Sequence, residues 1–207
     1  GVLEYTSSDT TPSISGTGEA GSSISVAMPT GEILTTTTDS AGKWSVTATQ
    51  ELNEALNTIT VTASDAAGNT STQSLRLLTD TQTTVTIALD PSSDTGLIGD
   101  NITTDHTPTI YGTAEIGSTV TIGTNFTSGS IGGFFVNADG TWAYTCPWDF
   151  GLRELILTAN VTDIAGNTNS QSVSINVVEI APEATAMSAF TQLDFDLQQT
   201  ITNNNIF

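Results

Sequence analysis

The densest run of oxygen-donating side chains lies between residues 90 and 105. It carries Asp90, Asp94, Asp100 and Asp105, separated by Gly, Ser, Thr and a few apolar residues. Calcium binds about six to eight hard oxygen atoms in a flexible cage, and short aspartates on a glycine-bent loop supply them. The run is not an EF-hand, because the aspartate spacing differs and no glutamate ends it. It indicates either a calcium-binding loop or an ordinary acidic loop rich in turns.

Four further acidic residues stand in short polar segments between apolar stretches. They are Asp80, Glu115, Asp139 and Asp163. One cation can bind them together only if the fold brings their segments to one place. Their chemistry therefore depends on the order of the strands that separate them.

Side chains suited to nucleophilic catalysis are scarce. The one histidine, His106, lies in a loop, and the one cysteine, Cys146, ends an alternating run that predicts a buried strand. The shortage of Cys and His also disfavours zinc. Paired carboxylates are abundant, but glycoside hydrolysis also needs a cleft with sugar-stacking groups. We therefore predict that the protein is not an enzyme.

The charge of the chain is strongly negative. It carries 22 acidic and 3 basic residues, for a formal net charge of −19. Nucleic-acid binding needs basic side chains that displace the counterions of phosphate, so neither nucleic acid nor an anionic membrane is an expected partner. So acidic a surface repels itself unless cations bind to it. The alternative is that the charge only keeps a secreted protein soluble.

Membrane insertion is not expected either. No apolar run approaches the roughly 20 residues needed to cross a bilayer, and the N-terminus lacks the pattern of a signal peptide. The single Cys146 cannot form an internal disulfide. Stability must therefore come from apolar cores or from bound metal.

The chain repeats itself once. Residues 11–22 (TPSISGTGEAGS) return as residues 107–118 (TPTIYGTAEIGS), an offset of 107 − 11 = 96. Residues 65–70 (DAAGNT) return as residues 163–168 (DIAGNT), an offset of 163 − 65 = 98. A repeat of about 100 residues is too long for a solenoid unit and suits an autonomous β-sandwich.

The repeat predicts two tandem Ig-like domains, residues 1–79 and 80–180. In the first domain we expect the first strand and the first loop to be short. Residues 181–207 carry no repeat motif and predict a tail that is either part of a further domain or disordered.

Apolar residues alternate with polar ones along short stretches, which is typical of β-strands with one buried face. Gly, Asn, Asp and Ser clusters separate these stretches, and no helix is indicated. We predict an all-β protein with seven strands in each copy. Those of the first copy are 2–5, 12–17, 23–28, 32–38, 43–48, 56–63 and 71–78, and those of the second are 84–89, 107–113, 119–125, 131–136, 141–146, 154–162 and 170–178.

Seven is an odd number of strands. In an antiparallel sandwich the chain then leaves at the end opposite to its start, so the two sandwiches should stack end to end. The loops after strands two, four and six lie at the starting end, and in the second copy they carry Glu115, Asp139 and Asp163. The linker residue Asp80 stands at the same end. We therefore predict a second cation site there. Groups of the first copy that could complete it are Asp9, Glu51 and Glu54.

The negative charges of this second site predict how a bound cation affects the joint between the domains. A like-charge pair about 4 Å apart costs roughly 4 kcal/mol at an effective dielectric near 20. Without a cation the cluster should push the domains apart, and a bound cation should stiffen the joint. The alternative is that Asp163, like Asp65 in the first copy, only forms its own turn.

Several motifs recur in a fixed order. Besides the repeated DAAGNT and DIAGNT, residues 90–103 read D-x-x-x-D-x-G-x-x-G-D-x-I-T ahead of TPTIYGTAE, and residues 139–142 read DGTW. Together they resemble the bacterial Ig-like repeats of giant type I-secreted adhesins of Gram-negative bacteria. The resemblance spans about residues 5–180.

The resemblance implies a non-catalytic stalk outside the cell, in a protein that attaches to host cells or takes part in biofilm. Its implied partners are calcium ions, the neighbouring Ig-like repeats and glycans or proteins of the contacted surface. We expect the chain to be a monomer. The family's aspartates map onto Asp90, Asp94, Asp100, Asp105 and Asp163.

A second hypothesis is that the second copy binds a glycan or a protein receptor. Trp148 and Phe150 follow Pro147 in a loop, where the first copy has no matching aromatic residue. These rings either cap the end of the sandwich or stack on a sugar.

Overall fold

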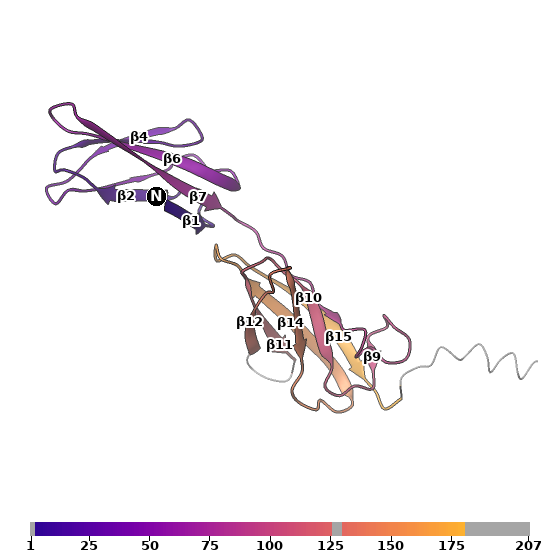
Figure 1. The fold of residues 1–207 in the computed structure, drawn as a ribbon. Helices are drawn as coiled ribbons and strands as arrows, with labels where there is room; N and C mark the ends of the chain where they lie inside the picture. Colours follow the sequence, from indigo (N-terminus) through magenta and orange to yellow (C-terminus); the bar gives the residue numbers. More distant parts are fainter. Residues whose placement is uncertain (1–2, 126–129, 181–207) are drawn as a thin grey trace, which may run out of the picture. The chain divides into compact units, whose positions relative to one another are not determined.

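The computed structural model describes residues 3–125 and 130–180, and every regular element in them is a β-strand (Figure 1). The predicted all-β class is confirmed, and the strands of each copy form two sheets. Within these residues no helix is both long and apolar enough to cross a membrane. The predicted tail, residues 181–207, lies outside the described residues.

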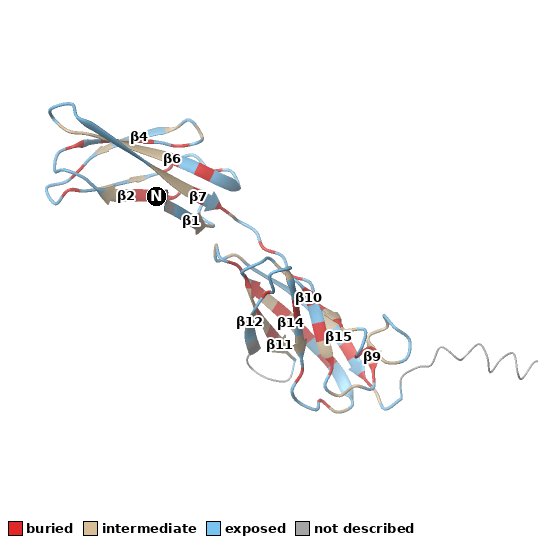
Figure 2. Ribbon diagram, viewed as in Figure 1, coloured by how far each residue is buried: buried red, intermediate tan, exposed pale blue. Residues whose placement is uncertain are grey.

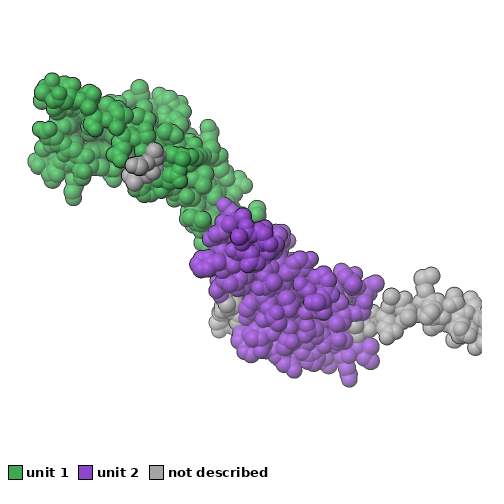
Figure 3. All heavy atoms as spheres, viewed as in Figure 1, with its two compact units in different colours: residues 1–84, 161–169 green, residues 85–160, 170–207 purple. Residues whose placement is uncertain are grey.

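The chain divides into two compact units (Figure 3). One is centred on residues 1–84 and the other on residues 85–160, and the short segment 161–169 is grouped with the first. Apart from the end of β14 and the start of β15, which fall in residues 161–169, each unit holds the strands of one copy of the repeat. The domain bounds and the end-to-end stacking stay predictions.

The first copy forms a sandwich of two sheets. Its strands are β1 (Leu3–Ser7), β2 (Ser13–Thr17), β3 (Ser23–Ala27), β4 (Ile33–Thr37), β5 (Lys43–Thr47), β6 (Ala55–Ser64) and β7 (Thr70–Thr79). One sheet has the order β1-β7-β6-β3-β4, and the other pairs β2 with β5. Apart from β1, which runs parallel to β7, the paired strands are antiparallel.

The second copy also forms two sheets, with one strand more. Its strands are β8 (Ala88–Leu89), β9 (Ile102–Thr103), β10 (Thr109–Thr113), β11 (Thr119–Thr124), β12 (Ser130–Phe135), β13 (Thr141–Thr145), β14 (Arg153–Thr162) and β15 (Thr168–Val177). The sheets have the orders β13-β10-β8 and β12-β11-β14-β15-β9. The predicted strands from 107 to 178 match β10 to β15 to within a few residues.

The pairing corrects the alignment of the first strands, in which residues 2–5 were matched to 84–89. β1 runs parallel to β7, with Thr6 opposite Leu78, and β9 runs parallel to β15, with Ile102 opposite Asn176. These pairs are related by the repeat offsets, 102 − 6 = 96 and 176 − 78 = 98. β1 is therefore the counterpart of β9, and no described strand of the first copy corresponds to β8. Each copy contains a parallel pair, which was not predicted. The described part of the second copy has eight strands instead of seven, because its first stretch is divided between two sheets.

Alternation of buried and exposed residues along the strands builds one apolar core in each copy (Figure 2). In the first copy Ile24, Val26 and Ile59 are at most 1% exposed, and Leu34, Val46 and Leu75 pack against this core. In the second copy Ile110 and Leu157 are fully buried. This periodicity of two is the sequence signal that predicted the strands.

Leu157→Ala should lower the free energy of unfolding of the second copy by about 2–5 kcal/mol, because it removes buried methylene groups and leaves a cavity. The neighbouring Ile156 on β14 is 42% exposed, so Ile156→Ala should cost about 1 kcal/mol or less. Urea denaturation followed by tryptophan fluorescence measures both losses. Equal losses would contradict the assignment of the two faces of β14.

Candidate metal sites

Asp80, Glu115 and Asp163 form a group of carboxylates, each with one oxygen atom within 4.8 Å of the others. Among residues 3–125 and 130–180 this is the one group of three or more acidic, Cys or His residues with such geometry. Asp163 is 8% exposed, Asp80 is half-buried and Glu115 is exposed. Three of the four residues predicted for the second site are thus brought together.

The loop after β14 positions Asp163. The main-chain N–H and the side-chain amide of Asn167 donate to the two carboxylate oxygens of Asp163, each at 2.8 Å. The main-chain N–H of Asp163 donates in turn to the Asn167 carbonyl at 3.1 Å. The turn hypothesis therefore holds for Asp163. It does not exclude a metal role, because each oxygen keeps a second lone pair.

The same loop holds the segment that carries Asp80. The Asn167 amide also donates to the Asp80 main-chain carbonyl at 2.8 Å, and the Asn169 amide donates to the Thr83 carbonyl at 2.8 Å. The main-chain N–H of Asp80 donates to the Ser7 carbonyl at 3.1 Å. Sequence reasoning missed the two asparagines. The repeat of Asn69 as Asn167 was visible, but Asn169 replaces a serine, Ser71, and carried no signal.

The first copy contains the same turn without the acidic group. Asp65 accepts from the Asn69 main chain at 2.8 Å and from its side-chain amide at 2.7 Å. The bond from the Asn69 side chain lowers the pKa of the Asp65 carboxyl below its usual value. Asp65 belongs to no three-residue group among the described residues. It is therefore a matched internal reference for Asp163.

The fourth residue predicted at this end, Asp139, is engaged elsewhere. One of its oxygens accepts from the Thr141 main-chain N–H at 3.0 Å and from the Thr141 hydroxyl at 2.6 Å. The hydroxyl bond lowers the pKa of the Asp139 carboxyl. The structure does not place Asp139 in the group formed by Asp80, Glu115 and Asp163.

The acidic loop of residues 90–105 uses most of its carboxylates to shape itself. Asp90 accepts from the Ser92 main chain at 2.9 Å and from its hydroxyl at 2.6 Å, and the hydroxyl bond lowers the pKa of Asp90. Asp100 accepts from the Ile102 main chain at 2.8 Å. Asp105 accepts from the Thr107 main chain and from the Ser93 hydroxyl, each at 2.8 Å. The four aspartates are not gathered into one group, and a calcium role for this loop stays a prediction.

Asp94 differs from the other three aspartates of this loop. It is 8% exposed, and one carboxylate oxygen accepts from the Gly99 main chain at 2.5 Å. The other oxygen is buried and has no hydrogen-bond partner. A buried carboxylate oxygen without a partner is costly. Among the four aspartates of this loop, Asp94 is therefore the one whose buried carboxylate oxygen is left open to a further ligand.

The two aromatic residues predicted as a ligand platform have different environments. Phe150 is 6% exposed, and its main-chain N–H donates to the His106 carbonyl at 3.0 Å. Trp148 is 51% exposed. The ring of Phe150 is therefore not accessible for stacking on a sugar, and of the two residues only Trp148 is exposed.

The two residues considered for catalysis, His106 and Cys146, have the following surroundings. The imidazole Nδ1 of His106 lies 2.9 Å from a carboxylate oxygen of Asp149. Burial raises the pKa of the Cys146 thiol to about 11. A nucleophilic cysteine needs a thiolate, which this environment disfavours.

The bacterial Ig-like domain family matches the chain twice, over residues 4–81 and 81–178. No curated protein matches the sequence.

Several solved structures show a likeness to the chain. A tetra-tandem repeat from the extending region of a large adhesion protein is 24% identical, with a TM-score of 0.42, over 84% of this chain and 48% of that one. A Ca2+-stabilized adhesin that helps an Antarctic bacterium bind ice is 25% identical, with a TM-score of 0.39, over 82% and 44%. A 1.5-MDa bacterial ice-binding adhesin is 16% identical, with a TM-score of 0.41, over 81% and 57%. The chain thus spans about half the length of these structures.

Because the family matches cover two consecutive stretches that together make up most of the sequence, the chain belongs to the bacterial Ig-like domain family and carries two tandem copies of the domain.

Proposed function

We propose that the chain is a pair of non-catalytic spacer modules from a large surface adhesin, and that calcium bound by Asp80, Glu115 and Asp163 stiffens it. Membership of the bacterial Ig-like family supports the module class. The observation that carries the calcium proposal is the approach of three carboxylate oxygens to within 4.8 Å of one another. The motifs that resemble those of type I-secreted adhesins support a place outside the cell, in attachment to host cells or biofilm.

The donor set of the group favours calcium over other metals. All three side chains offer hard carboxylate oxygens, and none offers nitrogen or sulfur. Zinc prefers Cys and His ligands, whereas calcium accepts mixed carboxylate, carbonyl and water ligands in flexible geometry. Waters and main-chain carbonyls would complete the shell.

The proposed mechanism is linkage between ion binding and order. Asp80 lies in the segment that joins the two copies, and Asp163 lies in a loop of the second copy. A cation shared by both would hold the connecting segment in place. Since the ion binds only the ordered arrangement, it stabilises that arrangement by about 2.7 kcal/mol at a calcium concentration near 100 times Kd. Extracellular calcium sites often have Kd values of about 0.1–1 mM. A site of this affinity would bind calcium outside the cell and stay empty inside it.

The alternative function, a module that binds a glycan or protein receptor, has less support. The hypothesis placed this site on Trp148 and Phe150, and of these two residues only Trp148 is exposed. We therefore retain the spacer function.

Asp163→Asn should weaken calcium binding at least tenfold, which corresponds to about 1.4 kcal/mol, because it removes one charge and one ligand oxygen. Isothermal titration calorimetry of the full chain, freed of metal beforehand, measures the change. Asp65→Asn is the matched control, since Asp65 makes the same turn bonds outside the group. The proposal fails if the two variants bind calcium as the unaltered chain does, or if both lose binding equally.

Removing calcium should make the chain more flexible in solution, because the three carboxylates then repel one another and release the connecting segment. Small-angle X-ray scattering of the full chain, with calcium and then with excess chelator, measures the change. At a calcium concentration that saturates the unaltered chain but lies below the Kd of the variant, Asp163→Asn should scatter like the chelated chain. Identical scattering of the unaltered chain with and without calcium would rule out the stiffening role.

A further inference from the structure

An aromatic side chain stands on the outer face of the three-stranded sheet of the second copy. Tyr111 of β10 is 41% exposed, and its chain neighbours Ile110 and Gly112 are buried, so it points to the outer face. In the strand pairing it lies opposite Ala88 of β8 and Ala143 of β13. Both of these neighbours end at Cβ. The aromatic ring is therefore accessible to a ligand from solvent.

Two pairs of threonine hydroxyls flank Tyr111 along the strand. Oγ1 of Thr113 lies 2.8 Å from Oγ1 of Thr86, and Oγ1 of Thr109 lies 2.8 Å from Oγ1 of Thr145. Two hydroxyls carry two hydrogens and a pair uses one, so each pair keeps one O–H that it does not use itself. Since Thr109 and Thr113 are each two residues from Tyr111, the hydroxyl pairs lie about 7 Å from it on either side.

These seven residues form a surface that we call the aromatic platform: Tyr111, Ala88, Ala143, Thr86, Thr109, Thr113 and Thr145. None of them is charged, although the chain has a formal net charge of −19. Asp90, whose N–H donates to the Thr109 carbonyl, borders the platform, and its carboxylate accepts two hydrogen bonds from Ser92. A neutral ligand suits this surface, because the rest of the chain repels an anionic one.

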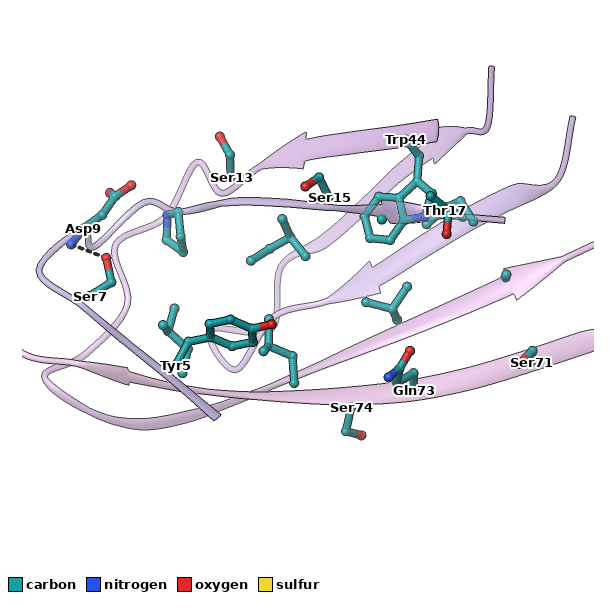
Figure 4. A pocket seen from close by; sticks show the side chains of 18 of the residues that line it. Tyr5, Ser7, Asp9, Ser13, Ser15, Thr17, Trp44, Ser71, Gln73 and Ser74 are labelled. Carbon is teal, nitrogen blue, oxygen red and sulfur yellow. Dashed lines mark hydrogen bonds between the residues drawn. The ribbon is translucent and has the colours of Figure 1, made fainter. Parts of the chain in front are cut away.

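The first copy has a similar hydroxyl pair without the ring. At the offset of 96, Tyr111 corresponds to Ser15, which lies between Ser13 and Thr17 on β2 (Figure 4). Oγ of Ser13 lies 2.8 Å from Oγ1 of Thr47, as in the equivalent threonine pair of the second copy. The strand therefore forms without an aromatic residue at this position, and the ring is particular to the second copy.

A sugar ring matches this combination of groups. A pyranose has a face of C–H groups that packs on an aromatic ring, and hydroxyls at its rim that exchange hydrogen bonds with other hydroxyls. Tyrosine offers a large contact area and has only two side-chain torsions to order. A protein interface needs a larger apolar centre, and the neighbours of Tyr111 across the strands are only alanines.

We infer that the aromatic platform binds a neutral oligosaccharide of β-linked pyranoses. One sugar ring stacks on Tyr111, and the hydroxyls of that ring and of the adjoining sugars bond to the threonine pairs. β-Linked chains are extended and expose flat ring faces, as a strip along one strand requires. The platform lies on a sheet and does not include Trp148 of the loop after β13. It adds a binding function to the proposed spacer role and does not depend on it.

Titration of the isotope-labelled full chain with cellohexaose, a neutral β-linked glucose hexamer, tests the inference by NMR. We expect saturable shifts centred on Tyr111 and Thr113, with a Kd of about 1 mM, because one stacked ring is a small contact. Tyr111→Ser installs the residue of the first copy and should weaken binding about tenfold or more. Tyr111→Phe keeps the ring and should bind about as tightly as the unaltered chain.

A matched pair of variants tests the place of the site without removing the ring. Ala143→Ile raises a branched side chain beside Tyr111 and should weaken binding about tenfold, while isoleucine remains well suited to a strand. Ser45 lies opposite Ser15 in the first copy, so Ser45→Ile makes the same change there and should leave binding unaltered. Trp148→Ala should also leave it unaltered.

Several results would overturn the inference. Cellohexaose, xylohexaose and β-mannohexaose could all fail to bind saturably well above 1 mM, the expected Kd. Tyr111→Ser could bind as the unaltered chain does, the two isoleucine variants could behave alike, or Trp148→Ala could abolish binding. A concentration-dependent dimer in sedimentation that Tyr111→Ser removes would assign the face to a second copy of the chain. Binding should persist in excess chelator, so the outcome is distinguishable from that of the metal proposal.

Discussion

The carboxylates of Asp80, Glu115 and Asp163 repel one another, because an oxygen atom of each lies within 4.8 Å of the others. Solvent screens this repulsion least at the buried carboxylate of Asp163 and most at the exposed carboxylate of Glu115. Asn167 orients Asp163 but carries no charge. Arg153 begins β14 and Asp163 follows its end, so about 30 Å of strand separates them. With a formal net charge of −19, the chain has little positive charge of its own to offset this repulsion. A cation bound from solution would reduce it.

The two copies show that local sequence does not by itself make a metal site. Asp65 and Asp163 accept the same pair of hydrogen bonds from the asparagine four residues on. Only Asp163 meets two further carboxylates. The two further carboxylates come from residues distant in the sequence. Both copies therefore share the turn, but only the second copy has the acidic group.

The sequence predicted what depends on periodicity and repetition, and it missed what depends on register. Alternating residues such as Ile24 and Val26 located the strands, and the two offsets located the copies. Strand order placed the loops of Glu115 and Asp163 at one end, and these residues do meet Asp80. The division of the first stretch between β8 and β9 was missed, because alternation does not reveal which sheet receives a strand. The bonds of Asn167 and Asn169 and the unpaired oxygen of Asp94 were missed because they depend on atomic positions that no motif encodes.

A crystal structure of the chain grown in calcium tests the central claim most directly. The account predicts an ion bound by oxygen atoms of Asp80, Glu115 and Asp163 at about 2.3–2.6 Å, with its identity checked by anomalous scattering. The crystals should contain calcium well above 1 mM, because such sites have Kd values of about 0.1–1 mM. Finding only water beside these three side chains would then contradict the account.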